Sequence, residues 1–179
     1  YHCGTKPVLR HVGAGMAGAM IVRPRGLKPV DRELWLTQQE FYLGEPNGDA
    51  SVDKMVAKTP DVVAFNGFAS QYLKHPVAVR RGERIRVWLV NAGTSLPSYF
   101  HVIGSVFDRV WSEGDARGSA QTLSLGPAEG GYVEFTLDDA KAYTRPWTVT
   151  MRQTLAPDTE LVDEICLEGL KPLHVAPGP

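Results

Sequence analysis

Four side chains with metal-binding donor atoms lie near the start of the chain. His2 and Cys3 are adjacent, and His11 and Met16 follow them with the spacing H-C-x7-H-x4-M. A thiolate, an imidazole and a thioether form a soft ligand set that suits copper, and a blue-copper site uses two histidines, one cysteine and a long axial methionine. We therefore expect Cys3, His11 and Met16 to bind a type 1 copper, with the missing histidine upstream of Tyr1.

His2 is a candidate ligand of a second metal. Neighbouring residues on a strand point to opposite faces, so His2 would point away from a copper held by Cys3. Two metals held by adjacent residues have a short covalent path for an electron, which indicates a redox enzyme rather than a simple carrier. The structural alternative makes Cys3 a small buried hydrophobe, His11 a loop residue and Met16 core filler. We prefer copper because all four residues share one Gly-rich segment.

Composition, charge and cysteine content exclude several other classes. The chain has 179 residues, 43% of them apolar, which is enough for one substantial core or for a domain plus part of another. Its 19 Lys and Arg against 20 Asp and Glu leave no basic field for nucleic acid or an anionic membrane surface. The longest uncharged apolar stretch, residues 12–22, is shorter than the ~20 residues that a membrane span needs. Two cysteines, Cys3 and Cys166, are too few for a disulfide framework.

Short strands dominate the rest of the chain and predict an all-β, antiparallel sandwich. The strand candidates are rich in β-branched or aromatic residues and are mostly flanked by Gly, Pro or Asn. They are residues 17–23, 33–43, 62–66, 84–91, 99–103, 107–113, 120–125 and 132–137. One helix is expected at residues 51–58, where Ser51 caps the first turn and Pro60 ends the element.

The elements divide into three pieces. Residues 1–27 are too short for a core and are interpreted as the end of a preceding domain, whereas residues 28–140 carry seven strand signals and form one complete sandwich. That sandwich contains no cysteine and so has no type 1 site of its own. In the tail, residues 141–179, an amphipathic helix is expected at 157–170.

These motifs together resemble copper nitrite reductases, in particular the nitrite-reductase-like multicopper oxidases with two cupredoxin domains. The sequence YHCGTKPVL at residues 1–9, followed by His11, GAGM at 13–16 and GA at 18–19, resembles the end of the first cupredoxin domain. The similarity continues through FNG (65–67), GERIRV (82–87), FHVIG (100–104) and FTL (135–137), and it covers about residues 1–140. The resemblance implies a cupredoxin-type Greek-key fold.

The resemblance also implies a role for each candidate residue. Cys3, His11 and Met16 would bind the type 1 copper that accepts electrons, and His2 would bind the catalytic type 2 copper. His101 matches a pocket histidine that helps to deliver protons to nitrite at the neighbouring subunit's type 2 copper; on its sequence alone it is as readily a core or interface histidine. The implied assembly is a homotrimer with catalytic copper at subunit interfaces, a small redox protein as electron donor, and a periplasmic or extracellular location.

The implied reaction is the reduction of nitrite to nitric oxide in denitrification, which takes one electron and two protons. A copper with an open position can bind the anion, and an imidazole can hold and release a proton near neutral pH. One rival is a laccase-like multicopper oxidase that reduces oxygen, but that family places histidine on both sides of the type 1 cysteine, and here Gly4 follows Cys3. The other rival, a non-catalytic cupredoxin electron carrier, has no use for His2.

Two departures from the family pattern remain. The strand that carries one type 1 histidine, one type 2 histidine and an acidic residue is not in the sequence, so we expect the chain to be a fragment. After FTL at 135–137 the family has a strand with another type 2 histidine, but here no histidine occurs between His101 and His174. A frameshift or truncation after about Ala140 is our preferred explanation.

Overall fold

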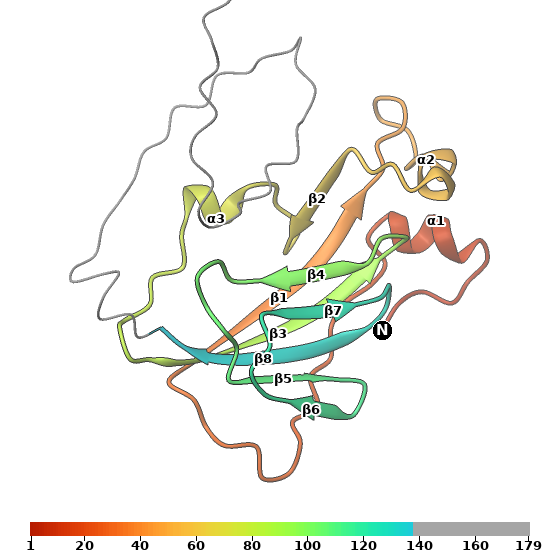
Figure 1. The fold of residues 1–179 in the computed structure, drawn as a ribbon. Helices are drawn as coiled ribbons and strands as arrows, with labels where there is room; N and C mark the ends of the chain where they lie inside the picture. The colour runs from red at the N-terminus through yellow and green to blue at the C-terminus, as the bar shows by residue number, and fades with distance from the viewer. Residues whose placement is uncertain (138–179) are drawn as a thin grey trace, which may run out of the picture. The chain divides into compact units, whose positions relative to one another are not determined.

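The computed structural model describes residues 1–137, which form an all-β body with three short helices (Figure 1). The order of elements is α1 (Val8–Gly13), β1 (Arg32–Phe41), α2 (Val52–Ala57), β2 (Val62–Phe65), α3 (Gln71–Lys74), β3 (Arg84–Gly93), β4 (Ser98–His101), β5 (Arg109–Ser112), β6 (Asp115–Arg117), β7 (Thr122–Leu125) and β8 (Gly130–Thr136). Each helix among these residues falls short of the length and hydrophobicity that a membrane span requires.

The strands form two sheets. Six strands pair in the order β2-β1-β3-β8-β5-β6, and β4 pairs with β7 in a second, smaller sheet. All of these pairs are antiparallel except β1 and β3, which run parallel with Arg32 opposite Ile85 and Leu36 opposite Leu89. Parallel neighbours need a long crossover connection, and the chain between β1 and β3 supplies it through α2, β2 and α3. The predicted sandwich is confirmed, with this one parallel pair as a correction to the expectation that every pair is antiparallel.

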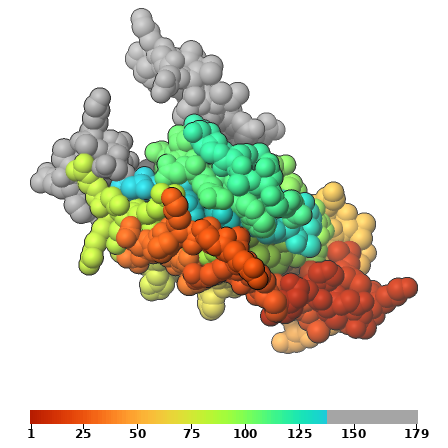
Figure 2. All heavy atoms as spheres, turned by 90° about the horizontal axis from the view of Figure 1, so that it is seen from below, coloured from red at the N-terminus to blue at the C-terminus, as the bar shows by residue number. Residues whose placement is uncertain are grey.

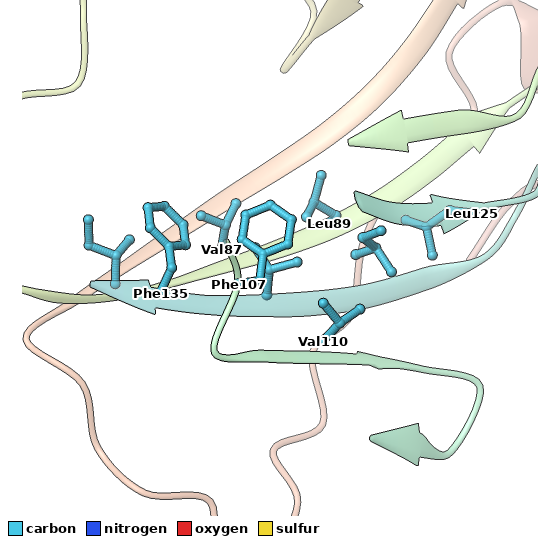
Figure 3. Packing of buried hydrophobic residues seen from close by; sticks show 9 residues of the cluster. Val87, Leu89, Phe107, Val110, Leu125 and Phe135 are labelled. Carbon is cyan, nitrogen blue, oxygen red and sulfur yellow. The ribbon is translucent and has the colours of Figure 1, made fainter. Parts of the chain in front are cut away.

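The core lies between the two sheets (Figure 3). Alternate residues of each strand point to one face, and the inward residues of β3, β8 and β5 meet those of β7 together with Phe107. The fully packed cluster is Ile85, Val87, Leu89, Phe107, Val110, Leu123, Leu125, Val133 and Phe135. Phe107 has no exposed surface, and its ring lies 6.2 Å from the Phe100 ring and 5.6 Å from the Phe135 ring. These contacts hold the smaller sheet on the larger one.

The opposite face of β3 and β8 buries a network of charges. Arg86 is 1% exposed, and its guanidinium donates to Glu134 over 2.8 Å, to Glu33 over 2.7 Å and to the Lys28 carbonyl over 2.6 Å. Burial alone would raise the pKa of Glu134, but hydrogen bonds from Arg84 and Arg86 outweigh it and hold that pKa below its ordinary value. The network ties the segment before β1 to the centre of the sheet.

Several local expectations were wrong. Residues 17–23 do not form a strand; within this segment Ala17 alone pairs, in an isolated bridge with His2. The candidate strand 107–113 is divided into a bridge between Phe107 and Ala120 followed by β5, and neither α1 nor β6 was expected.

The predicted helix at 51–58 is confirmed as α2. Ser51 Oγ accepts from the Lys54 N–H, and the helix ends at Ala57, before the expected end at Pro60, with Lys58 as its C-cap at φ 58°. The helix expected at 157–170 lies outside the described residues, and the domain divisions at 27/28 and 140/141 stay predictions.

Candidate metal centre

A small hairpin brings Cys3 next to Met16. The Cys3 N–H donates to the Met16 carbonyl over 2.9 Å, the Gly18 N–H donates to the Tyr1 carbonyl over 2.9 Å, and His2 forms a bridge with Ala17. These backbone hydrogen bonds are those of an antiparallel pair. The two ends of the metal-binding segment are thus held side by side by main-chain groups.

The helix α1 lies in the connection between the two paired segments of the hairpin and carries His11. It starts after Pro7 and ends at Gly13, and hydrogen bonds from Ala14, Gly15 and Met16 to the carbonyls of Arg10, Val12 and His11 turn the chain back. Gly15 has φ 91°, a left-handed conformation that glycine adopts without steric cost. As a result the His11 Nδ1 atom lies 3.3 Å from the Cys3 Sγ atom.

The Cys3 thiol is prepared for metal binding by its surroundings. A hydrogen bond from the Thr5 backbone, followed in size by the one from the His11 side chain, lowers its pKa from the ordinary 9.0 to about 7. The thiolate is the form that binds metals. Two donors that each lie 2.0–2.3 Å from one ion at a tetrahedral angle are about 3.5 Å apart, which is close to the observed Sγ to Nδ1 distance. The pair fits one soft metal ion.

Met16 completes this arrangement only in part. Its backbone carbonyl accepts a hydrogen bond from the Cys3 N–H, and its side chain is 53% exposed. Among residues 1–137, no group of three or more His, Cys, Asp or Glu side chains is close enough to hold a metal by itself. The structure therefore brings Cys3 and His11 together and places the Met16 backbone beside them, and the complete type 1 ligand set stays a prediction.

His2, the residue before Cys3, is exposed. Its Nδ1 atom is 2.9 Å from the Cys3 carbonyl oxygen. A carbonyl accepts only, so Nδ1 carries the proton and Nε2 keeps a free lone pair, which is the arrangement common in metal-binding histidines. His2 lines a hollow of about 340 Å³ together with Val8 of α1, Ala92 near the end of β3 and Pro127 in the loop before β8.

His101 ends β4, opposite Thr122 of β7, and is exposed. Its Nδ1 donates to the Gln121 carbonyl over 2.6 Å, so the same argument leaves its Nε2 free to exchange a proton. The end of β4 that carries His101 points away from the N-terminus (Figure 1), so His101 does not join His2 within one chain. Ile103, two residues after His101, is also exposed, with 93% of its surface accessible.

The sequence did not predict the groups that lower the pKa of Cys3 and orient the His101 ring. The Thr5 N–H that acts on Cys3 and the Gln121 carbonyl that orients His101 are backbone atoms. Every residue type carries them, so no sequence signal marks them. The Gly13 position was noticed as part of a motif, but its contact with a distant helix, described below, leaves no local signal either.

Solved structures with a similar fold are copper proteins. A copper nitrite reductase from Nitrosomonas europaea superposes with a TM-score of 0.65 at 29% identity, over 76% of this chain and 51% of that chain. A blue copper oxidase from the same organism superposes with a TM-score of 0.60 over 77% and 45% of the two chains, and at 24% identity it supports the fold alone. The chain therefore shares its fold with cupredoxin-type copper oxidoreductases, and the Cys3–His11 pair is the part of the predicted site that lies together.

Sequence relatives narrow this class. The copper-containing nitrite reductase of Neisseria gonorrhoeae is 37% identical over 153 residues, which are 80% of this chain and 39% of that protein. The one from Neorhizobium galegae is 31% identical over 136 residues, 64% and 36% of the two chains. No protein-family profile matches the chain. Over four fifths of its length the chain is similar in sequence to copper-containing nitrite reductases, as its motifs predicted, and it spans about two fifths of the length of the curated relatives it matches.

Proposed function

We propose that the chain is part of an enzyme that reduces nitrite to nitric oxide with a type 1 copper at Cys3, His11 and Met16 and a type 2 copper at His2. The observation that carries this proposal is the contact of 3.3 Å between Cys3 Sγ and His11 Nδ1, with the free Nε2 of His2 one residue away. When bound, the first copper supplies single electrons and the second binds and polarises the anion.

Cys3 and His2 provide the electron route. They are joined by one peptide bond, and the hydrogen bond between the His2 ring and the Cys3 carbonyl adds a second connection. A path this short suits transfer of one electron between two sites. Gly4, which follows Cys3, offers no ligand to a third copper, and this favours one catalytic copper over the three-copper cluster of a laccase-like oxidase.

His101 provides half of the proton route. Reduction of nitrite by one electron breaks one N–O bond, and the oxygen takes up two protons and leaves as water. The Nδ1 atom of His101 donates to the Gln121 carbonyl, so Nε2 can take up a proton from solvent and then pass it to the departing oxygen. Because His101 lies away from His2 within one chain, it would act at the copper of a neighbouring copy. A homotrimer, a small redox protein as donor and a periplasmic or extracellular location complete the proposal.

The test separates the two copper sites. The copper-loaded protein is reduced without oxygen, nitrite is added, and nitric oxide is measured with an electrode alongside the visible spectrum. His2→Ala is expected to keep the blue absorption and to lose about a hundredfold or more of the nitric oxide formation, while Cys3→Ser loses both. His75→Ala, which changes an exposed histidine outside the site, serves as the matched control and leaves both unchanged.

Two outcomes would contradict the proposal. Oxygen consumption without nitric oxide formation would indicate the laccase-like alternative. A blue protein that neither reduces nitrite nor consumes oxygen would indicate an electron carrier.

A further inference from the structure

The helix that carries His11 docks closely on α2. A Cβ atom at Gly13, the last residue of α1, would lie 2.2 Å from Cε and 2.7 Å from Sδ of Met55. Met55 is 1% exposed and lies in the middle of α2. Figure 2 shows the N-terminal segment (red) against the segment around α2 (yellow-orange), and Figure 1 shows the two helices as neighbours. The approach is so close that a Cβ atom at this position would force the end of the Met55 side chain to move.

A second contact fixes the direction of α1. Arg10, the residue before His11, forms an ion pair with Asp49 in the connection between β1 and α2. Both side chains are exposed, so the pair contributes little energy. It nevertheless joins the same two segments as the Gly13–Met55 contact. Two independent contacts, one before and one after His11 in the sequence, therefore connect its helix to α2 and to the loop that precedes α2.

A buried carboxylate holds α2 to the sandwich. Glu40, on β1, is 3% exposed and accepts from the backbone N–H groups of Ser95 and Leu96 over 3.0 and 2.8 Å. The Ser95 hydroxyl in turn donates to the Met55 carbonyl over 3.0 Å. The sequence of contacts runs from β1 through the loop after β3 to Met55, and from there to Gly13. The part of α2 that contacts α1 is thus held to the sandwich by hydrogen bonds.

Alone, α1 has little to hold it. It has six residues, none of them buried, and no side-chain cap at its start. Isolated helices of this length are unstable in water, and tertiary packing supplies most helical stability. The hairpin fixes Cys3 through its own hydrogen bonds, whereas His11 depends on where α1 lies.

We propose that Met55 is a positioning residue for the metal centre: by filling the space against Gly13 it sets where His11 stands relative to Cys3. The inference rests on the proposed function only for the identity of the metal, since the packing that it uses is present without one. Removal of the Met55 side chain leaves α1 without its support, and the His11 ring then samples a wider range of distances from Cys3.

The first measurement needs no copper. Hydrogen exchange is followed by mass spectrometry in the copper-free protein for peptides covering residues 8–17 and, as an internal reference, β3. Met55→Ala is expected to speed exchange in residues 8–17 by about tenfold while β3 stays protected, because opening of one region need not open the rest. Met55→Leu, of similar volume, restores slow exchange. Val56→Ala, on the same helix at a 70% exposed position, is the control and changes neither peptide.

The second measurement uses the copper-loaded protein. Met55→Ala is expected to change the ratio of the two thiolate-to-copper absorption bands, and Met55→Leu is expected to return it to the original ratio. Unchanged exchange at residues 8–17, an equal rise in exchange in β3, or an unchanged band ratio in Met55→Ala would overturn the positioning role. If the unaltered protein shows no such bands while Met55→Ala still speeds exchange at 8–17, the proposed copper function fails and the positioning role stands.

Discussion

The sandwich and the metal-binding segment are ordered by different forces. In the sandwich, nine apolar side chains pack into one buried cluster. In residues 1–18 backbone hydrogen bonds close the hairpin, and no residue of α1 is buried. The sandwich therefore resists change through its side-chain packing, whereas the metal-binding segment takes its shape from main-chain bonds and from the surface on which it lies. Substitutions should separate these regions, because those in the first alter stability and those in the second alter the chemistry of the site.

The largest effect is expected in the core. Phe107→Ala removes a ring with no exposed surface that contacts both Phe100 and Phe135. Loss of a buried aromatic ring costs about 3–5 kcal/mol through lost burial and the remaining cavity. Urea unfolding followed by circular dichroism measures the change, with Phe68→Ala, 70% exposed, as the control. Equal losses in the two variants would mean that the two sheets are not held together as described.

An intermediate effect is expected from the buried charges under acid. The pKa of Glu134 is lowered, so its carboxylate stabilises the fold fully above the ordinary value of 4.5, and this contribution is lost as the pH falls through the lowered value. Glu134→Gln is expected to be less stable at neutral pH, by about 3 kcal/mol because Arg86 loses a buried partner, and to show a weaker decline in acid. Unfolding free energies measured from pH 7 to pH 3 test this. An unchanged slope in the variant would contradict the role of Glu134.

The smallest effect on stability, and the clearest on chemistry, is expected in the metal-binding segment. His11→Ala removes a hydrogen bond that lowers the pKa of Cys3, so that pKa should rise from about 7 towards 9.0. The free energy of unfolding should change by less than about 0.5 kcal/mol, because His11 lies outside the packed core of the sandwich. The rate of Cys3 alkylation against pH gives the pKa, in a Cys166→Ser background that leaves one cysteine. His75→Ala is the control, and an unchanged alkylation profile in His11→Ala would show that the two side chains do not interact in solution.

Local sequence patterns predicted where the strands lie better than they predicted which strands pair with one another. Seven strand candidates, from residues 33–43 onward, overlap observed strands because β-branched and aromatic residues mark them. The parallel pairing of β1 with β3 is set by a connection of some forty residues, and no short window carries that information. The predicted strand at residues 17–23 was wrong for a related reason. A strand requires a partner, and among the described residues of this segment Ala17 alone has one.

The sequence likewise predicted one part of the metal centre and not the rest. The spacing of Cys3 and His11 predicted that they belong together, and the structure brings them within 3.3 Å. It did not predict α1, whose residues include two β-branched valines that do not favour a helix. The support from Met55 depends on packing between distant segments, and such contacts are visible only in three dimensions. The roles of His2, Met16 and His101 stay predictions.

The parallel pair has a consequence for the order of folding. Antiparallel neighbours such as β5 and β6 meet across a short turn, whereas the contacts of β1 with β3 join residues about fifty positions apart, as in the pairing of Arg32 with Ile85. Closing a loop of that length is entropically costly and slow. Because α2 lies within this loop, the support for α1 is complete only once the loop has closed. We therefore expect the metal ligands to reach their final arrangement among the last events of folding.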